Sequence, residues 1–415
     1  MKHLGFWIRM AMCACCVTAA MPLAAQECTD VLLLDAVERV RTMNLDSTGH
    51  WWAVTQPFED LMGLIVDGKA YGPYESVLNP RFSFDGSNFA ASVKVQGRWV
   101  VRTIEDSIPL EGDVLYDTYL PSMSSTPWWI HGNGADMRIS TFQQSYRCAS
   151  APQGLCSDPT GTIVAWVESR GTQFALLVNG REAAIADDVL LGGILADGSV
   201  VHARKFGLRW WVYAGTQEIA PSLAAVSQLM VNTNGTACAW AALDAAGFQR
   251  VYCYSAEMNN PWMSVPLEHA AGVVISPVEA LVAAKVILNG NPMVLYNGAM
   301  YPAGKQTGPL AFSNDGGTLC YGGVDGDPFV CINGKRHWVK GSVNLTVPLL
   351  LDNSNTAVAW PSATTLAYVN VETNILRLGK MCDVMGPAVY NKQSKSFMAL
   401  GLVTGRLFLL TCKPL

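Results

Sequence analysis

Residues 80–101 read PRFSFDGSNFAASVKVQGRWVV. The stretch consists of an apolar entry that ends in Phe-Ser-x-Asp-Gly, an apolar run, and a glycine turn that leads into a second apolar run. Much the same phrase returns in residues 309–332, PLAFSNDGGTLCYGGVDGDPFVCI. A recurring phrase of this kind indicates a repeat protein, in which each copy is one supersecondary unit that packs against its neighbours.

Weaker copies of the unit fill most of the chain. Aligned on the turn before the long apolar run, they begin at Asn44, Pro80, Pro121, Gly154, Gly192, Gln228, Ala271, Pro309, Leu349 and Ala388. In each copy an apolar strand leads through a turn with Asp, Asn or Gly into a second strand rich in Ala, Val and Trp. Glycine turns then introduce a third strand and a more polar fourth strand, and Asn-Gly or Asp-Gly suits such turns because these residues tolerate positive φ. Four antiparallel strands in roughly 40 residues make one blade of a β-propeller.

The apolar pattern favours a propeller over a β-sandwich. A strand with one face in water alternates apolar and polar residues. The second strands here are apolar on both faces, as in residues 162–166, 236–240 and 356–360, which suits strands that lie between two neighbouring blades. We therefore predict an all-β fold, a single β-propeller over residues 26–415 with about ten four-stranded antiparallel blades. Eight or nine blades are the alternative, because the copies at Pro121 and Ala388 are degenerate.

A closed ring needs its ends joined. The last copy supplies only three strands, while residues 28–40, CTDVLLLDAVERV, contain an apolar strand that precedes the first copy. We expect this N-terminal strand to complete the last blade.

Residues 1–25 have the pattern of a secretory signal peptide. Basic residues precede an apolar segment at residues 10–23, and the small residues Ala24 and Ala25 are followed by polar ones. We expect cleavage after Ala25, since the apolar segment is short for a membrane span of about 20 residues. An uncleaved anchor and a lipidated cysteine are the alternatives. No later stretch is long and apolar enough to span a bilayer, so we expect an exported chain that is periplasmic or associated with the cell envelope.

The composition limits the classes of partner. Half of the residues are hydrophobic and 15% are charged, which permits a large core. The net charge is −5, and no cluster of Lys and Arg occurs. Nothing in this balance favours a nucleic acid as partner.

The Phe-Ser-x-Asp-Gly phrase resembles the WD40-like (PD40) repeat of TolB-type bacterial β-propellers, in which a proline precedes the Asp and an alanine-rich strand follows. The matching residues are Phe82, Ser83, Asp85, Gly86 and Ala90 in one copy, and Phe312, Ser313, Asp315 and Gly316 in the other. Phe84 and Asn314 stand where the family has its proline. Residues 67–74 resemble the entry to the outer strand in related repeats. The resemblance implies a propeller with a binding role and no particular reaction.

Turn residues of the repeats have a structural interpretation, because a short polar side chain can cap its own turn and glycine tolerates positive φ. We assign this role to Asp46, Asp85, Asp197, Asp315, Gly86, Gly161, Gly235 and Gly316. A sialidase-type Asp-box is the alternative, since residues 313–317 fit its first half. Leu319 and Cys320 occupy the place of its aromatic end, and we therefore prefer turn capping.

Nine cysteines follow residue 25, since three of the twelve lie before it, and disulfides persist in exported proteins. Candidate pairs are the ends of two expected neighbouring strands, two pairs placed symmetrically about hairpin turns, and one pair that flanks a short loop. They are Cys28–Cys412, Cys238–Cys253, Cys320–Cys331 and Cys148–Cys156. Cys382 is left over and could compete for either terminal partner. Buried free thiols that act as small hydrophobes are the alternative.

No residues form a recognisable catalytic set. The histidines after residue 25 are dispersed among unequal repeat positions, and we predict no metal, cofactor or catalytic residue. Three Trp-Trp pairs begin at Trp51, Trp128 and Trp210. Adjacent strand residues point to opposite faces, so packing between blades explains these pairs better than an aromatic platform for a ligand.

We therefore expect an exported, non-catalytic β-propeller that serves as a protein or peptide interaction module. A secreted hydrolase that processes glycans or peptides is the alternative. A ring of charged residues around the centre would favour the hydrolase, and a patch of exposed aromatic residues would favour the binding module. A structural component of the envelope is a third option.

Overall fold

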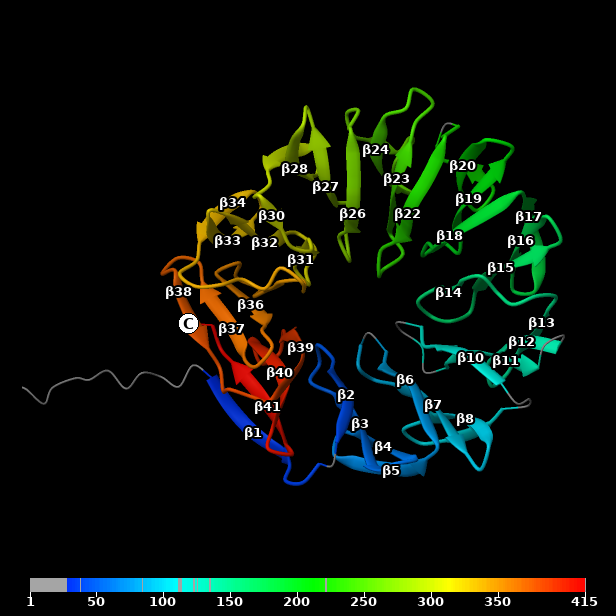
Figure 1. The fold of residues 1–415 in the computed structure, drawn as a ribbon. Coiled ribbons are helices and arrows are strands. Elements are labelled where there is room, and N and C mark those ends of the chain that lie inside the picture. Colours follow the sequence, from blue (N-terminus) through cyan, green and yellow to red (C-terminus); the bar gives the residue numbers. More distant parts are fainter. Residues whose placement is uncertain are drawn as a thin grey trace, which may run out of the picture.

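The structure is a computed structural model that describes residues 28–37, 39–83, 85–110, 114–121, 124, 126–133, 136–220 and 222–414. These residues form ten antiparallel sheets arranged as a ring (Figure 1). No helix occurs among them, and none of their segments is a helix that could cross a membrane. The prediction of an all-β propeller with about ten blades is confirmed. The predicted signal peptide lies outside the described residues.

The first five blades follow one another in sequence. Blade 1 contains β2 (Val40–Leu45), β3 (Trp51–Phe58), β4 (Leu61–Val66) and β5 (Lys69–Tyr74). Blade 2 contains β6 (Ser76–Phe82), β7 (Phe89–Val95), β8 (Arg98–Thr103) and β9 (Ser107–Pro109). Blade 3 contains β10 (Val114–Tyr119), β11 (Trp128–Asn133), β12 (Asp136–Ser140) and β13 (Ser145–Cys148). Blade 4 contains β14 (Leu155–Ser157), β15 (Val164–Arg170), β16 (Gln173–Val178) and β17 (Arg181–Ala186). Blade 5 contains β18 (Asp188–Ile194), β19 (Val200–Phe206), β20 (Arg209–Ala214) and β21 (Gln217–Glu218).

The remaining blades continue the ring. Blade 6 contains β22 (Ala225–Val231), β23 (Ala237–Leu243), β24 (Gln249–Ser255) and β25 (Trp262–Met263). Blade 7 contains β26 (His269–Ile275), β27 (Val282–Leu288), β28 (Asn291–Tyr296) and β29 (Ala299–Pro302). Blade 8 contains β30 (Gln306–Thr307), β31 (Ala311–Phe312), β32 (Leu319–Asp325), β33 (Asp327–Ile332) and β34 (Lys335–Trp338). Blade 9 contains β35 (Leu350–Leu351), β36 (Ala357–Pro361), β37 (Leu366–Asn370) and β38 (Ile375–Leu378). Blade 10 contains β39 (Val384–Asn391), β40 (Ser396–Val403), β41 (Arg406–Cys412) and β1 (Cys28–Leu34).

The core consists of apolar side chains between neighbouring blades. Neighbouring residues of one strand serve opposite interfaces, because side chains alternate across a sheet. Trp51 packs in the cluster between blades 10 and 1, and Trp52 packs in the cluster between blades 1 and 2. Trp128 and Trp129 divide in the same way between the two interfaces of blade 3. These pairs therefore act in packing between blades.

The two ends of the chain join in blade 10. Strand β1 pairs antiparallel with β41, and Cys28 lies opposite Cys412, to which it is disulfide-bonded. Figure 1 shows the N-terminal strand on the outer side of β41. The predicted closure by the N-terminal strand is confirmed. The strand ends at Leu34, however, and Val40 already belongs to β2, the inner strand of blade 1.

The other three proposed disulfides are corrected by the register of the strands. The hairpin of blade 8 centres on Gly326, so that Cys320 lies opposite Ile332 and Cys331 lies opposite Tyr321. Cys320 therefore faces blade 9 while Cys331 faces blade 7. The same one-residue offset separates Cys238 from Cys253 in blade 6. Cys148 and Cys156 lie on opposite sides of blade 4. All six are free thiols, as is Cys382.

The turns of each blade define two faces of the ring. In an antiparallel blade, the turn between the first and second strands lies on the same side as the turn between the third and fourth. We call this side the Asp-turn face, because the predicted Asp and Gly residues lie on it. The turns between second and third strands lie on the opposite face.

Candidate functional site

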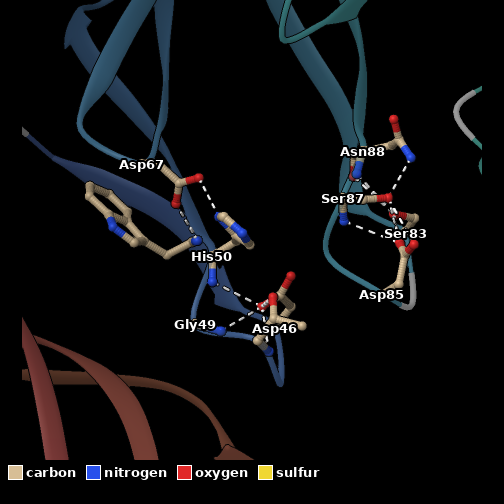
Figure 2. A network of polar contacts seen from close by, with 10 residues as sticks. Asp46, Gly49, His50, Asp67, Ser83, Asp85, Ser87 and Asn88 are labelled. Atoms are coloured by element: carbon tan, nitrogen blue, oxygen red, sulfur yellow. Dashed lines mark hydrogen bonds and ion pairs between the residues drawn. The ribbon is translucent and has the colours of Figure 1, made fainter. Parts of the chain in front are cut away.

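The turns between first and second strands carry the residues that the sequence singled out. In blade 2, the Ser83 hydroxyl donates a hydrogen bond to Asp85 Oδ1 at 2.6 Å, and the Ser87 backbone N–H donates to the same oxygen at 3.1 Å (Figure 2). Partial burial alone would raise the pKa of Asp85, but the hydrogen bonds from Ser83 and Ser87 outweigh it and lower the pKa. The carboxylate is therefore engaged within its own turn.

Asp46 occupies a different place in its turn. Its Oδ1 accepts backbone hydrogen bonds from Thr48, Gly49 and His50, each at 2.9 Å (Figure 2). The backbone bonds of this turn align Asp46 with Ser83 rather than with Asp85. Asp197 and Asp315 lie at the position of Asp85 and accept hydrogen bonds from the backbone two residues later. The four aspartates thus cap their turns from two distinct positions.

The four turn glycines lie where neighbouring blades meet. Each has positive φ, between 70° and 80°. A Cβ on Gly235 would lie 2.7 Å from the backbone N of Ala196, in the turn of the preceding blade. A Cβ on Gly86 would overlap the Thr48 hydroxyl and one on Gly316 would overlap the Ser276 hydroxyl, both in the preceding turn, while one on Gly161 would lie 3.0 Å from Pro121. These turns therefore form a belt of contacts around the Asp-turn face.

The histidines and free cysteines of the described residues form no metal site. No group of three or more metal-ligating side chains occurs in the described part of the chain. His50 Nδ1 lies 2.8 Å from Asp67 Oδ2, which ties two turns of blade 1 together (Figure 2). Burial raises the pKa of Cys156, Cys253 and Cys320 to about 12. Thiols in such surroundings are inert, because the thiolate is the reactive form.

The interface between blades 2 and 3 differs from the others. Its apolar cluster holds four buried residues, Val101, Leu110, Leu115 and Trp129. Among the described residues this is the smallest of the ten inter-blade clusters. A buried hydrogen bond between the hydroxyls of Ser92 and Thr118 crosses the same interface. We call this interface the blade 2–3 seam.

A cleft of about 340 Å³ opens at the seam on the Asp-turn face. Its lining includes Trp129, His131, Arg138, Ser140 and Phe142. The Phe142 ring is 44% exposed and meets the buried Trp129 edge to face, with the ring centres 5.5 Å apart. The cleft thus combines an exposed aromatic ring with a cation and with hydrogen-bonding groups. We call it the Arg138 cleft.

A chain of hydrogen bonds runs along the wall of the Arg138 cleft. His131 Nε2 lies 2.9 Å from the Ser140 hydroxyl, which in turn lies 2.8 Å from the hydroxyl of Ser145. His131 and Ser140 are buried, and Ser145 is exposed. This Ser–His contact is the arrangement in the described residues that comes nearest to an activated nucleophile.

A second cleft of about 330 Å³ lies beside the first. It is lined by Ser87 and Asn88 from one turn of blade 2 and by Glu105 and Asp106 from another. Phe142 lines this cleft as well, so that its ring separates two spaces of opposite charge. We call it the Glu105 cleft.

A third and larger cleft, of about 470 Å³, lies on the Asp-turn face between blades 5 and 7. Asp197, Glu257 and Glu279 line it together with the turn glycine Gly235. It places one predicted turn aspartate at a concave surface.

The sequence pattern indicated no binding role for the residues of the two seam clefts. Those of the Arg138 cleft lie mainly in blade 3, the repeat in which the Phe-Ser-x-Asp-Gly phrase is lost, whereas the Glu105 cleft is lined mainly by blade 2, where the phrase is intact. The available signal was this loss of the phrase, together with the polar run Gln143-Gln144-Ser145.

Comparisons with known proteins give limited information. No family model matches the sequence, and no curated protein matches it. A solved structure described as "Crystal structure of the eukaryotic initiation factor" is similar in fold, with a TM-score of 0.46 and 12% sequence identity. The match covers 83% of this chain and 87% of that chain. Similarity at this level supports no inference about function.

Proposed function

We propose that this protein is an exported, non-catalytic β-propeller that binds a protein or peptide partner. The observation that carries the proposal is the pair of clefts on either side of Phe142 at the blade 2–3 seam. Exposed aromatic rings held by a buried neighbour are typical anchors of protein interfaces. Propellers present such surfaces on their turns, although the fold alone assigns no partner.

The proposal includes export to the periplasm or cell envelope. Residues 1–25 would act as a cleaved signal peptide, and the Cys28–Cys412 disulfide is compatible with an oxidising compartment. Cell fractionation with N-terminal sequencing is expected to give an envelope protein that begins at Gln26; a cytoplasmic protein that keeps residues 1–25 would contradict export.

The binding role is tested by capture from the envelope of the source cell. Purified mature protein is crosslinked to an envelope extract as wild type, as Phe142→Ala, and as Phe248→Ala. Phe248 is a matched control because its exposure is similar, at 48% against 44%, but it lies on the opposite face. We expect a stoichiometric partner with wild type and Phe248→Ala and its loss with Phe142→Ala. Equal capture by all three proteins, or no partner with any, would contradict the proposed site.

A second candidate function rests on the contact between His131 and Ser140. If Ser140 is a nucleophile, the protein is a secreted hydrolase of esters or peptides, with His131 as the base. A fluorophosphonate probe would then label the wild type but not Ser140→Ala. Failure of the probe to label the folded wild type would remove this candidate.

A further inference from the structure

We propose that the two seam clefts bind an extended peptide segment in which an acidic and a basic side chain flank an apolar residue. The inference rests on the proposed peptide-binding function and specifies its ligand. The acidic side chain would enter the Arg138 cleft, the basic one the Glu105 cleft, and the apolar one would lie on Phe142.

The Arg138 cleft carries uncompensated positive charge. Arg138 Nε and Arg147 Nε lie 3.7 Å and 3.3 Å from the same oxygen of Asp136, so two guanidinium groups share one carboxylate. No carboxylate lines the cleft itself. A guanidinium binds a carboxylate through two parallel hydrogen bonds, and the hydroxyl of Ser145 offers a further donor beside it. An acidic side chain fits this set of groups.

The Glu105 cleft has the opposite character. Glu105 and Asp106 line it, and neither forms an ion pair with a described residue. No Lys or Arg lines the cleft. Ser87 and Asn88 add hydrogen-bonding groups at its wall. A lysine or arginine side chain of a ligand complements these charges.

Phe142 fixes the order of the three side chains. It lines both clefts, so an apolar residue placed on its ring has one charged group on each side. Its contact with the buried Trp129 holds the ring in place. An extended peptide advances about 3.3 Å per residue with side chains on alternate sides, so the side chains that face one surface are two residues apart. The apolar residue therefore lies midway between charges that are about four residues apart.

Defined peptides test the inference. End-blocked, fluorescein-labelled peptides of Gly and Ser carry Glu, Leu and Lys in either order at separations of two, three and four residues. Matched peptides replace Glu by Gln, Lys by Gln, or Leu by Ser. Binding to the disulfide-intact mature protein is followed by fluorescence polarisation at low and high salt. We expect the peptides with one order to bind best, with up to about a fivefold loss for each neutralised charge, since solvent-exposed charge pairs contribute only modestly.

Variants assign each preference to its cleft. Arg138→Gln should abolish the preference for Glu over Gln and keep the preference for Lys, whereas the double variant Glu105→Gln/Asp106→Asn should do the reverse. Arg98→Gln is the matched control, because it removes the same charge from an exposed arginine of β8 that lines neither cleft. Its preferences should equal those of the wild type.

The possible results distinguish a failure of this inference from a failure of the proposed peptide-binding function. Peptide binding that keeps its charge preferences in Arg138→Gln would overturn the inference while leaving a peptide-binding role. Absence of binding by every peptide, together with unchanged partner capture by Phe142→Ala, would overturn both.

Discussion

Gly235 lies in a turn where the backbone of the preceding blade leaves no room for a side chain. Gly171 has nearly the same φ, 69° against 70°, but faces open space. Alanine at either position adopts an unfavourable left-handed conformation that costs about 1–2 kcal/mol. We expect Gly235→Ala to lower the free energy of unfolding by about 1–3 kcal/mol more than Gly171→Ala, because it also forces two blades apart. Equal losses in urea unfolding would show that the belt of turns does not constrain the ring.

His202 gives the stability a dependence on pH. The side chain is buried in β19, where Nδ1 donates to the Val200 carbonyl at 3.0 Å and Nε2 accepts from Arg204 Nε at 2.9 Å. Burial, together with the Arg204 charge, lowers the pKa of His202 from 6.5 to about 4. The unfolded chain therefore binds a proton between these values that the folded chain does not bind. This contribution to stability is complete above pH 6.5 and is lost as the pH falls towards 4.

We expect the free energy of unfolding to fall by up to about 3 kcal/mol between pH 7.5 and pH 4 through His202 alone. Urea unfolding at a series of pH values measures the slope. His202→Gln removes the titrating group, so its slope should be shallower over this range. Identical slopes for the variant and the wild type would contradict the assignment.

The hairpin between second and third strands is capped by an acidic residue that precedes the first strand of the same blade. Asp187, before β18, accepts a hydrogen bond from the Gly207 backbone N–H through Oδ2 at 2.7 Å. The same arrangement recurs in three further pairs: Glu75 with Gly97, Glu268 with Gly290, and Asp383 with Thr404. This hydrogen bond links the residue before the first strand to the hairpin between the second and third strands, and so positions the start of the blade.

Removal of one such cap should have a modest effect, because the group is exposed. We expect Asp187→Ala to lower the free energy of unfolding by about 1 kcal/mol, the usual value of a capping hydrogen bond. Glu182→Ala is a control, since Glu182 is an exposed carboxylate in β17 of the neighbouring blade 4. A loss in the control equal to that in Asp187→Ala, measured by urea unfolding, would argue against the cap.

The ring as a whole is closed by one strand, one disulfide and one apolar cluster. The Cys28–Cys412 bond joins residues 384 positions apart. A crosslink over so long a loop restricts the unfolded chain and stabilises the fold by about 6 kcal/mol in the entropic model. The cluster of Met43, Trp51 and Leu400 holds blades 1 and 10 together independently of the bond.

We expect Cys28→Ser/Cys412→Ser to remain a folded propeller with a melting temperature lowered by about 5 °C or more. Differential scanning calorimetry with and without reductant measures the shift. Reductant should destabilise the wild type and leave the double variant unchanged. A variant that melts at the wild-type temperature would mean that the apolar cluster alone closes the ring.

The sequence by itself determined the class of fold, the ten blades and the closure of the ring. The apolar runs and turn residues that specify each blade lie within about 40 consecutive positions, so the blades can be recognised from the sequence alone. The joining of Cys28 and Cys412 could be predicted because three strands in the last copy require a fourth. The export of the chain remains a prediction.

Only the tertiary structure decided what depends on register and on contacts between blades. In two hairpins the centre of the turn lies half a residue away from the expected position. The cysteines that were expected to form disulfides are therefore not opposite each other, and they are free thiols that face different blades. The approach of Gly235 to Ala196 and the shared wall at Phe142 join side chains from different repeats. Such contacts depend on how neighbouring blades are placed against each other, and local turn and strand patterns do not specify that placement.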